Sequence, residues 1–234
     1  MKKIYAFVPA RSGSQRVKNK NLKKIGKKAL LQYTIDQINN SKKIQKGFIS
    51  TDYTSLEKEI SLSQDIEIIK RPKNIAKSNS LDIDWILHLL DKLKNDIPDI
   101  IVILRPTSPF REPKFIDSSI NKFINYDNYD SARAIKLVKE HPDKMWVKKD
   151  DLIFPYNGFK NINNEDLHSM QYKSLQEVYV QTSSLEILNT KSLLANKKLS
   201  GEKVLPIYSD FMNSFTIDYD IDLKIADLII NKQL

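Results

Sequence analysis

Cysteine is absent from this chain of 234 residues. Its absence excludes a disulfide framework and a zinc site built on thiolates, and it is compatible with a reducing compartment. Long apolar runs are missing as well. The apolar stretch near the N-terminus, residues 4–9, is too short for a membrane span and is not followed by a small-residue cleavage site. We therefore expect a cytoplasmic protein with no membrane partner.

Acidic residues are outnumbered, with 29 Asp and Glu against 38 Lys and Arg, a formal net charge of +9. Such an excess suits a nucleic acid, an anionic lipid or a small polyanionic substrate. The densest basic run, residues 18–28, contains no aromatic side chain on which bases could stack. We therefore expect an enzyme that binds phosphate groups, and no nucleic-acid partner.

Acids are also missing from residues 11–24, which directly follow the first apolar run. The basic residues there are Arg11, Arg16, Lys18, Lys20, Lys23 and Lys24. Residues 4–9 predict a buried strand, and Gly13 in the following loop allows backbone N–H groups to converge on an anion. Ligands of open α/β sheets bind at the carboxyl ends of strands, where this loop lies. The pattern predicts a phosphate site; the alternative is a solvated basic loop.

Apolar runs typical of strands alternate with amphipathic segments along most of the chain. Strands are predicted at residues 4–9, 47–51, 66–69, 100–104, 131–138, 178–187 and 204–207, and helices at 29–40, 80–95, 114–126 and 222–232. This alternation is typical of an α/β fold with a mostly parallel, Rossmann-like sheet and helices on both faces. We expect one domain over residues 1–234, with a small inserted lobe at about residues 139–177 around a polar excursion at 143–171.

Four segments together resemble the acylneuraminate cytidylyltransferases, which activate sialic-acid-like sugars as CMP conjugates. PARSGSQRVKNKNL, residues 9–22, is similar to the family's P-A-R-x-G-S-K-x-x-x-x-K-N-L loop. The other three are Ser50-Thr51-Asp52, Arg71-Pro72 with Ala76 following, and LRPTSPFR at residues 104–111. They occur in the family's order and spacing, and the resemblance covers nearly the whole chain.

The resemblance implies a fold of the nucleotide-diphospho-sugar transferase type and transfer of CMP from CTP to a small acidic acceptor, with Mg²⁺ as cofactor. It also implies a homodimer built partly from residues 143–171. The catalytic residues it implies are Arg11, Lys20 and Asp218. An arginine fork and a lysine point charge are suited to phosphate oxygens. We assign no general base.

Residues that match the family's binding positions fall into two groups. The nucleotide group is Ala10, Arg11, Ser12, Gly13, Ser14, Arg16, Lys20, Asn21, Arg71 and Ser78. The acceptor group is Arg105, Thr107, Ser108, Thr182 and Glu186. For Arg71, which the resemblance places near the base or ribose, the alternative is a surface arginine beside a proline.

The segment FTIDYDIDLKIAD, residues 215–227, is similar to the family's final motif, in which two aspartates separated by one residue hold Mg²⁺ before a helix. Two registers fit it. In one, Asp222 starts the helix, Asp218 is the second metal aspartate and Thr216 replaces the first. In the other, Asp218 and Asp220 form the pair. We favour the first, in which Asp220 is a solvated turn residue; Mg²⁺ commonly takes one or two carboxylates plus substrate phosphates.

The chain departs from the family chiefly on the acceptor side. Arg105 stands where the family has Gln, and residues 182–187, with Glu186, stand where it has N-G-A-I-Y-I. Gln15 replaces a lysine whose charge Arg16 can supply. Either Arg105 pairs with an acceptor carboxylate or phosphonate, or it pairs with Glu186 and reshapes the pocket. Two other functions stay open: nucleotidyl transfer to a different acceptor, and nucleotide binding without catalysis.

Overall fold

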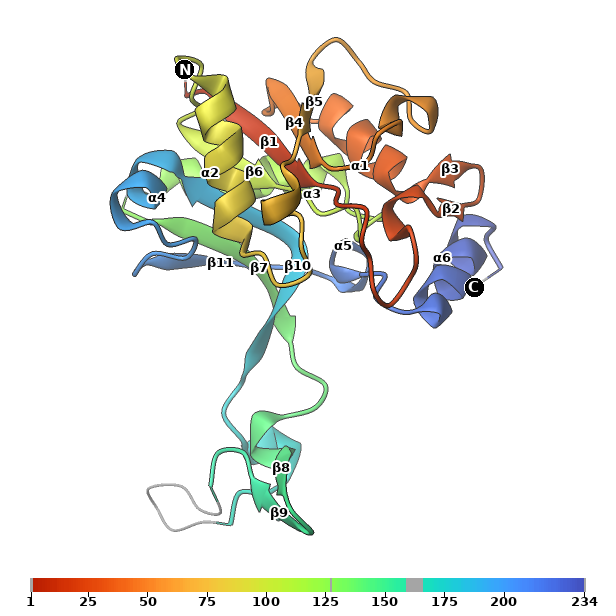
Figure 1. Ribbon diagram of the computed structural model, residues 1–234. Coiled ribbons are helices and arrows are strands. Elements are labelled where there is room, and N and C mark those ends of the chain that lie inside the picture. Colours follow the sequence, from red (N-terminus) through yellow and green to blue (C-terminus); the bar gives the residue numbers. More distant parts are fainter. Residues whose placement is uncertain (1, 127, 159–165, 234) are drawn as a thin grey trace. The chain divides into compact units, whose positions relative to one another are not determined.

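A computed structural model describes residues 2–126, 128–158 and 166–233 (Figure 1). Its contacts divide the chain into two compact units. Unit 1 is Met1–Ala134 with Thr182–Leu234, and unit 2 is Ile135–Gln181. The lobe expected at residues 139–177 falls within unit 2, although residues 159–165 of the expected excursion lie outside the described residues. That the whole chain acts as one domain stays a prediction.

A seven-stranded sheet runs in the order β11-β7-β10-β6-β1-β4-β5. Its strands are β1 Ile4–Pro9, β4 Lys46–Thr51, β5 Ile66–Lys70, β6 Ile100–Ile103, β7 Ser131–Leu137, β10 Tyr179–Asn189 and β11 Val204–Tyr208. β1 pairs in parallel with β4 and β6, and β4 with β5, whereas β10 pairs with β6 in antiparallel orientation. The prediction of an α/β fold with a mostly parallel sheet is confirmed.

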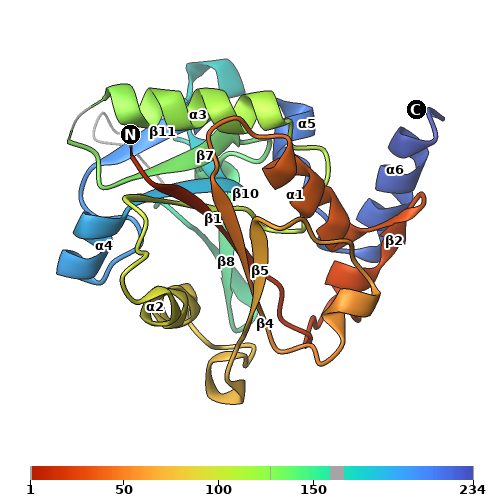
Figure 2. The ribbon, with the colours of Figure 1, turned by 90° about the horizontal axis from the view of Figure 1, so that it is seen from above.

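Helices cover both faces of this sheet (Figure 2). On one face α1 Leu30–Asn39 and α3 Pro113–Asn125 pack against β1, β4 and β6 in one buried apolar cluster. On the other face α2 Asp82–Leu93 and α4 Thr190–Asn196 pack in a second cluster with β1 and β6. The central strands are apolar on both sides because both sides are covered. The predicted helices at 29–40, 80–95 and 114–126 end within a few residues of α1, α2 and α3.

Short elements escaped prediction because they are too brief to show a period. They are α4, α5 Phe211–Ser214, the hairpin β2 Lys24–Ile25 with β3 Lys28–Ala29, and the 3₁₀ turns Lys20–Leu22, Leu56–Lys58, Lys73–Ile75, Pro142–Lys144 and Tyr172–Ser174. The β2–β3 hairpin overlaps the loop predicted at residues 11–24 only at Lys24, and its last residue, Ala29, falls in the predicted helix at 29–40. Gly26 turns it with a φ of +57°, a conformation that glycine adopts readily.

The last helix, α6 Asp220–Ile230, begins two positions before the predicted start at Asp222. Asp222 is its third residue, and its Oδ2 accepts hydrogen bonds of 2.8 Å from the backbone N–H groups of Asp218 and Tyr219. The acid therefore stabilises the helix N-terminus from within the first turn. A small apolar cluster joins α6 to the β2–β3 hairpin, which brings the C-terminal segment to the loop after β1.

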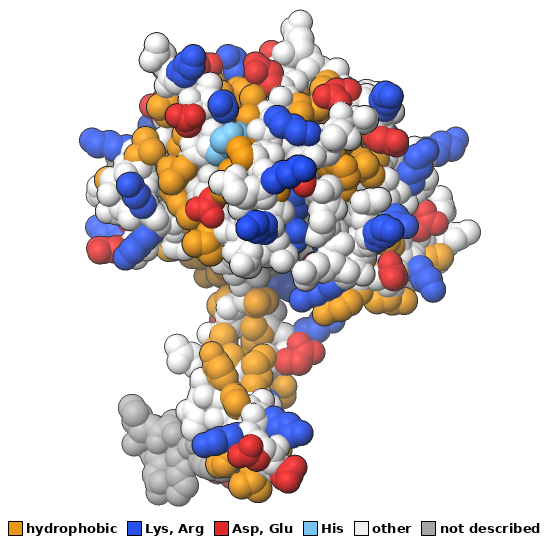
Figure 3. All heavy atoms as spheres, viewed as in Figure 1, with side chains coloured by type: hydrophobic (Ala, Val, Ile, Leu, Met, Phe, Trp, Pro, Cys, Tyr) orange, Lys and Arg blue, Asp and Glu red, His pale blue; other side chains and the backbone are white. Residues whose placement is uncertain are grey.

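Unit 2 contains a hairpin of β8 Trp146–Lys149 and β9 Leu152–Pro155. Outside the hairpin, a 2.8 Å hydrogen bond joins His141 Nε2 to the carbonyl of Gln176. The hairpin has little core of its own, and hydrophobic side chains gather on the face of unit 2 seen in Figure 3. Among the described residues of the whole chain, no helix is long and apolar enough to cross a membrane.

Candidate active site

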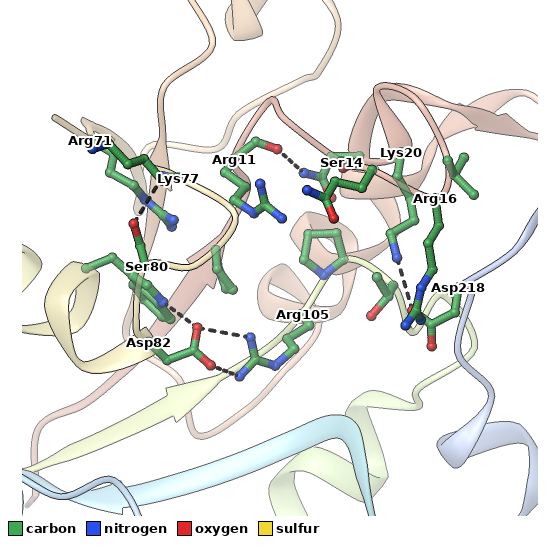
Figure 4. A pocket seen from close by; sticks show the side chains of 17 residues that line it. Arg11, Ser14, Arg16, Lys20, Arg71, Lys77, Ser80, Asp82, Arg105 and Asp218 are labelled. Carbon is green, nitrogen blue, oxygen red and sulfur yellow. Dashed lines mark hydrogen bonds and ion pairs between the residues drawn. The ribbon is translucent and has the colours of Figure 1, made fainter. Parts of the chain in front are cut away.

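Four parallel strands of unit 1 end at one edge of the sheet, and residues at and after the ends of β1, β5 and β6, together with Asp218, line a pocket of about 360 Å³ (Figure 4). The lining residues are Pro9, Arg11, Ser14, Gln15, Arg16, Val17, Lys20, Asn21, Arg71, Lys77, Ser80, Asp82, Trp85, Arg105, Pro106, Thr107 and Asp218. Six of them are basic and two acidic, so the pocket attracts anions. Its place at the carboxyl ends of the strands is where open α/β sheets bind ligands.

The loop after β1 is held in shape by neighbouring strand ends. Asp52, directly after β4, accepts hydrogen bonds of 2.7 Å from both the backbone N–H and the hydroxyl of Ser12. Burial raises the pKa of Asp52, but these bonds from Ser12 outweigh it, so that the pKa lies below its ordinary value. Asn21 donates to the carbonyl of Arg11 at 3.0 Å. The loop is thus fixed by side chains that leave Arg11 and Lys20 at the pocket.

Lys20 and Asp218 meet at the far side of this loop. Lys20 Nζ donates to the carbonyl of Ile217 at 2.8 Å and lies 3.2 Å from Asp218 Oδ1. The Asp218 side chain is 46% exposed, against 15% for Lys20. Arg16 lies over the ring of Tyr219, 5.1 Å from its centroid. An ammonium, a guanidinium and an accessible carboxylate therefore share one end of the pocket.

Only one of the two candidate metal aspartates faces the pocket. Asp218 lines it, whereas Asp220 is exposed at the start of α6 and does not. Within residues 2–126, 128–158 and 166–233 there is no group of three His, Cys, Asp or Glu residues that could hold a metal ion. A single accessible carboxylate still fits Mg²⁺ when the phosphates of a nucleotide and water supply the other oxygens. This arrangement favours the first register.

Arg71 is buried, so the alternative of a surface arginine is wrong. Its Nε donates to Ser50 Oγ at 2.9 Å, its Nη2 to the Ser50 carbonyl at 3.1 Å, and its guanidinium lies 5.3 Å from the centroid of the Trp85 ring. Burial lowers the pKa of Arg71 to about 10, with Asp52 and Asp82 opposing the shift. The side chain remains cationic at neutral pH and lines the pocket beside an aromatic ring.

Arg105 takes part in ion pairs with two acids at the opposite end of the pocket. Its Nη2 lies 2.6 Å from Asp82 Oδ2 and 2.7 Å from Glu186 Oε1. Glu186 also pairs with Arg133 of β7. Burial raises the pKa of Asp82. The opposing effect of its charged partners, chiefly the charge and hydrogen bonds of Arg105, is larger, so the pKa lies below its ordinary value. Of the two arrangements expected for Arg105, the structure contains the pair with Glu186.

The pocket brings together much of the predicted set. Lining it are Arg11, Ser14, Arg16, Lys20, Asn21, Arg71, Arg105, Thr107 and Asp218. Eight other predicted residues do not line it: Ala10, Ser12, Gly13, Ser78, Ser108, Thr182, Glu186 and Asp220.

Most of these eight have other surroundings. Ala10 and Ser108 are fully buried, and Ser12 is bonded to Asp52. Thr182 donates to the carbonyl of Ala134 at 3.2 Å, and Glu186 is held by its arginines. Gly13 contributes its carbonyl to Arg11 at 2.6 Å. Ser78 is exposed.

Sequence reasoning missed Lys77, Ser80, Asp82 and Trp85, which all line the pocket. Trp85 lies inside the predicted helix at 80–95, and its side chain is only 2% exposed because it packs in the core. Asp82 is the first residue of α2, and it accepts a 2.8 Å hydrogen bond from Trp85 Nε1. The sequence does place these residues between Arg71, at the end of a predicted strand, and the start of the next predicted helix, and this position could have indicated that they line the pocket.

Comparison with known proteins links this geometry to one family. A family model described as cytidylyltransferase matches residues 5–222. The chain is 27% identical over 232 residues to the N-acylneuraminate cytidylyltransferase of Escherichia coli O18:K1:H7 (strain RS218 / NMEC), with 99% of this chain and 53% of that protein covered. The chain thus spans about half the length of that relative.

Two further relatives match over nearly their whole length. The chain is 25% identical to the post-translational flagellin modification protein B of Campylobacter coli, covering 100% of this chain and 97% of that one. It is 26% identical to the CMP-N,N'-diacetyllegionaminic acid synthase of Legionella pneumophila, covering 95% and 92%.

Solved structures share the fold. The structure of CMP:2-keto-3-deoxy-manno-octonic acid synthetase complexed with CTP superposes with a TM-score of 0.69 at 12% identity, covering 99% of this chain and 100% of that one. The 4-diphosphocytidyl-2C-methyl-D-erythritolsynthase of Anaerococcus prevotii gives a TM-score of 0.60 at 14% identity, with 98% and 96% covered.

Proposed function

The chain belongs to the cytidylyltransferase family, and from that premise we propose that it transfers CMP from CTP to a nonulosonic or related sugar acid. The observation that carries the proposal is the pocket itself. Arg11, Arg16 and Lys20 from the loop after β1 meet the accessible carboxylate of Asp218 there. Cations suited to a triphosphate and one ligand suited to a divalent metal therefore lie on the same side of one cavity.

The chemistry is a substitution at the α-phosphorus of CTP. The oxygen of an acceptor hydroxyl forms a bond to that phosphorus, the bond from the phosphorus to the oxygen shared with the β-phosphate breaks, and pyrophosphate leaves as the hydroxyl proton is lost. Negative charge grows on the leaving oxygen and is stabilised by fixed donors. Arg11 and Lys20 serve as those donors. Mg²⁺, held by Asp218 and phosphate oxygens, would supply further neutralisation of that charge.

The class of acceptor is supported by the names of the relatives. Two matched proteins are named for N-acylneuraminate and N,N'-diacetyllegionaminic acid, both sugar acids. Identities near 25% support the class but not one compound. We therefore propose a nonulosonic acid or a related acidic sugar, and a cytoplasmic setting where CTP is made.

A homodimer is part of the proposal. Unit 2 exposes large apolar side chains on and beside its hairpin. They are Met145, Trp146, Val147, Leu152, Ile153, Phe154, Tyr156 and Tyr172, each more than 40% exposed. A surface of this kind is typical of an interface between protein chains. A second copy of this chain offers the same apolar surface and accounts for its exposure.

Pyrophosphate release from CTP tests the proposed activity, with a panel of sugar acids as acceptors and Mg²⁺ present. The wild-type protein should release pyrophosphate with CTP and not with UTP or GTP. Arg11→Ala and Asp218→Ala should abolish release while the melting temperature stays close to wild type, because both side chains are accessible. Asp220→Ala, the matched control two residues away, should keep most of the activity. Two results would contradict the proposal: release with another nucleotide instead of CTP, or activity that is lost in Asp220→Ala and kept in Arg11→Ala and Asp218→Ala.

A further inference from the structure

Four charged side chains form a line of ion pairs at the end of the pocket opposite Lys20, here called the ion-pair cluster: Asp82, Arg105, Glu186 and Arg133. Asp82 pairs with Arg105, Arg105 with Glu186, and Glu186 with Arg133. They come from the start of α2, the loop after β6, β10 and β7. Two cations and two anions make the cluster neutral, so Arg105 does not act there as an unpaired positive charge.

Burial in the ion-pair cluster is greatest at its inner pair and falls toward the pocket. The exposed fraction of the side chain is 2% for Glu186, 9% for Arg133, 22% for Arg105 and 37% for Asp82. Separating a buried charge from its partner is strongly unfavourable, whereas a partly exposed pair is weak. The pair of Glu186 with Arg133 is therefore fixed. The pair of Arg105 with Asp82 is the one that a ligand can reach, and both of its members line the pocket.

The N–H donors of Arg105 are divided between Glu186 and Asp82. Its Nε, at 3.2 Å, and its Nη2 bond to Glu186 on the buried side. Its Nη1 and Nη2 point to the two oxygens of Asp82, at 3.5 and 2.6 Å, in the forked arrangement visible in Figure 4. This is the geometry in which a guanidinium binds any carboxylate. Asp82 thus occupies the edge of Arg105 that a carboxylate ligand would need.

We propose that Asp82 is a specificity-determining residue that competes with the acceptor's carboxylate for Arg105. The proposal rests on the proposed function, because it concerns the acid that accepts CMP. Without acceptor, Asp82 compensates the charge of Arg105. The carboxylate of an acidic acceptor replaces Asp82 at the exposed edge of Arg105. Asp82 then keeps its hydrogen bond from Trp85 Nε1 and is otherwise solvated. A neutral analogue has no charge with which to displace Asp82 and binds without Arg105.

Calorimetry with two probes, N-acetylneuraminic acid and 2-keto-3-deoxy-manno-octonic acid, each beside its carboxamide, tests the competition. Saturating CMP replaces CTP, so that no turnover occurs. Asp82→Asn should bind each acid about fivefold more tightly than wild type does, which is equivalent to the ~1 kcal/mol of a partly exposed ion pair. It should bind each carboxamide with the affinity of wild type. Asn keeps an oxygen for Trp85. Asp91→Asn, the same change on an exposed residue of α2 outside the pocket, is the control and should leave both affinities unchanged.

A second background separates competition from simple charge removal. Arg105→Gln should weaken binding of the acids, and adding Asp82→Asn to it should then bring no gain. A gain in that background would mean that Asp82 only repels anions, which overturns the proposal. So would unchanged or weaker acid binding by Asp82→Asn, or no binding of either acid by any variant. Failure of the proposed function is distinct: it leaves acid binding intact and releases no pyrophosphate from CTP.

Discussion

Asp52 holds the loop after β1 in shape. It receives two hydrogen bonds from Ser12 and stands at the end of β4, next to the strand that precedes the loop. The neighbouring Thr51 donates to the carbonyl of Ala10 at 2.7 Å. Pre-ordering of a loop lowers the entropic cost of binding its ligand. Asp52 is therefore a positioning residue for the loop. Both of its bonds come from Ser12, which does not line the pocket.

Replacement of Asp52 by Asn should reduce stability in a pH-dependent manner. Since the pKa of Asp52 in the folded protein lies below its ordinary value, its carboxylate stabilises the fold at pH values above about 4, the unfolded pKa, and loses this effect as the pH falls through the folded pKa. Chemical denaturation should show Asp52→Asn about 1 kcal/mol less stable at pH 7 and nearly equal to wild type at pH 3.

The control for this experiment is Asp65→Asn, an exposed aspartate before β5. It should differ little from wild type at both pH values. A difference between Asp52→Asn and wild type that is as large at pH 3 as at pH 7 would contradict an ionic role for Asp52.

At single residues, sequence reasoning located the cations better than their partners. Arg11, Lys20 and Arg71 were identified from motifs, and all three line the pocket. The roles of Asp82 and Arg133 were not foreseen, because a pairing between residues far apart in the chain leaves no local pattern. Glu186 was predicted to bind the acceptor, with a pair to Arg105 as the alternative, and the structure buries it between Arg105 and Arg133.

Among the elements, α6 matters most to the site because Asp218 lies just two residues before the helix begins at Asp220. The backbone N–H of Asp218 is held by Asp222, and the helix packs on the β2–β3 hairpin that extends the loop. A hydrogen bond of 2.8 Å links Gly26 N to Asp227 Oδ1 across that contact. The carboxylate that we propose as a metal ligand is thus fixed by a helix start.

Asp222→Ala should loosen this turn. Removal of two hydrogen bonds at a helix N-terminus lowers the free energy of unfolding by about 1 kcal/mol, and the released backbone of Asp218 should raise the Mg²⁺ concentration needed for half-maximal pyrophosphate release. Thermal melting and a Mg²⁺ titration measure the two effects. Asp220→Ala, which removes an exposed acid from the same turn, is the control. Equal effects from both variants would contradict the positioning role.

Long periodic elements were predictable and short ones were not. The strand at residues 4–9 and the helix at 29–40 are apolar over enough residues to show their periods, and both were predicted close to their observed bounds. α6 was predicted two residues late because Asp222 was taken as the first helical residue. Its hydrogen bonds to Asp218 and Tyr219 show that an acid at the third position serves the same purpose.

For the whole molecule, the resemblance read from four motifs is confirmed at the level of the family. The motifs left open whether Arg105 pairs with Glu186 or with an acceptor, and they did not show that Asp82 and Arg133 join this pair, since that depends on residues brought together by β7, β10 and α2. The fold follows from local segments with clear periods, whereas the ion pairs of Arg105 depend on tertiary contacts.

The proposed dimer predicts a response to charge on the unit 2 hairpin. Leu152 and Phe154 lie two residues apart on β9, on one face of the strand, and are 64% and 43% exposed. Leu152→Glu with Phe154→Glu should convert a dimer to a monomer in light scattering coupled to size exclusion. Phe211→Glu with Ile221→Glu, at equally exposed apolar residues of unit 1, is the matched control and should remain dimeric. A monomeric wild type, or a control that dissociates equally, would contradict the interface.

Calorimetric titration of CTP into the protein in the presence of Mg²⁺ tests the central claim most directly, because the proposed transfer of CMP requires CTP in the pocket of unit 1. The account predicts binding of one CTP per chain, about tenfold or more weaker in Arg11→Ala and in Lys20→Ala, since each removes a charge-assisted hydrogen bond. Lys58→Ala, which removes an exposed lysine that does not line the pocket, should bind as wild type does. No heat of binding with CTP, or equal affinity in all four proteins, would contradict it.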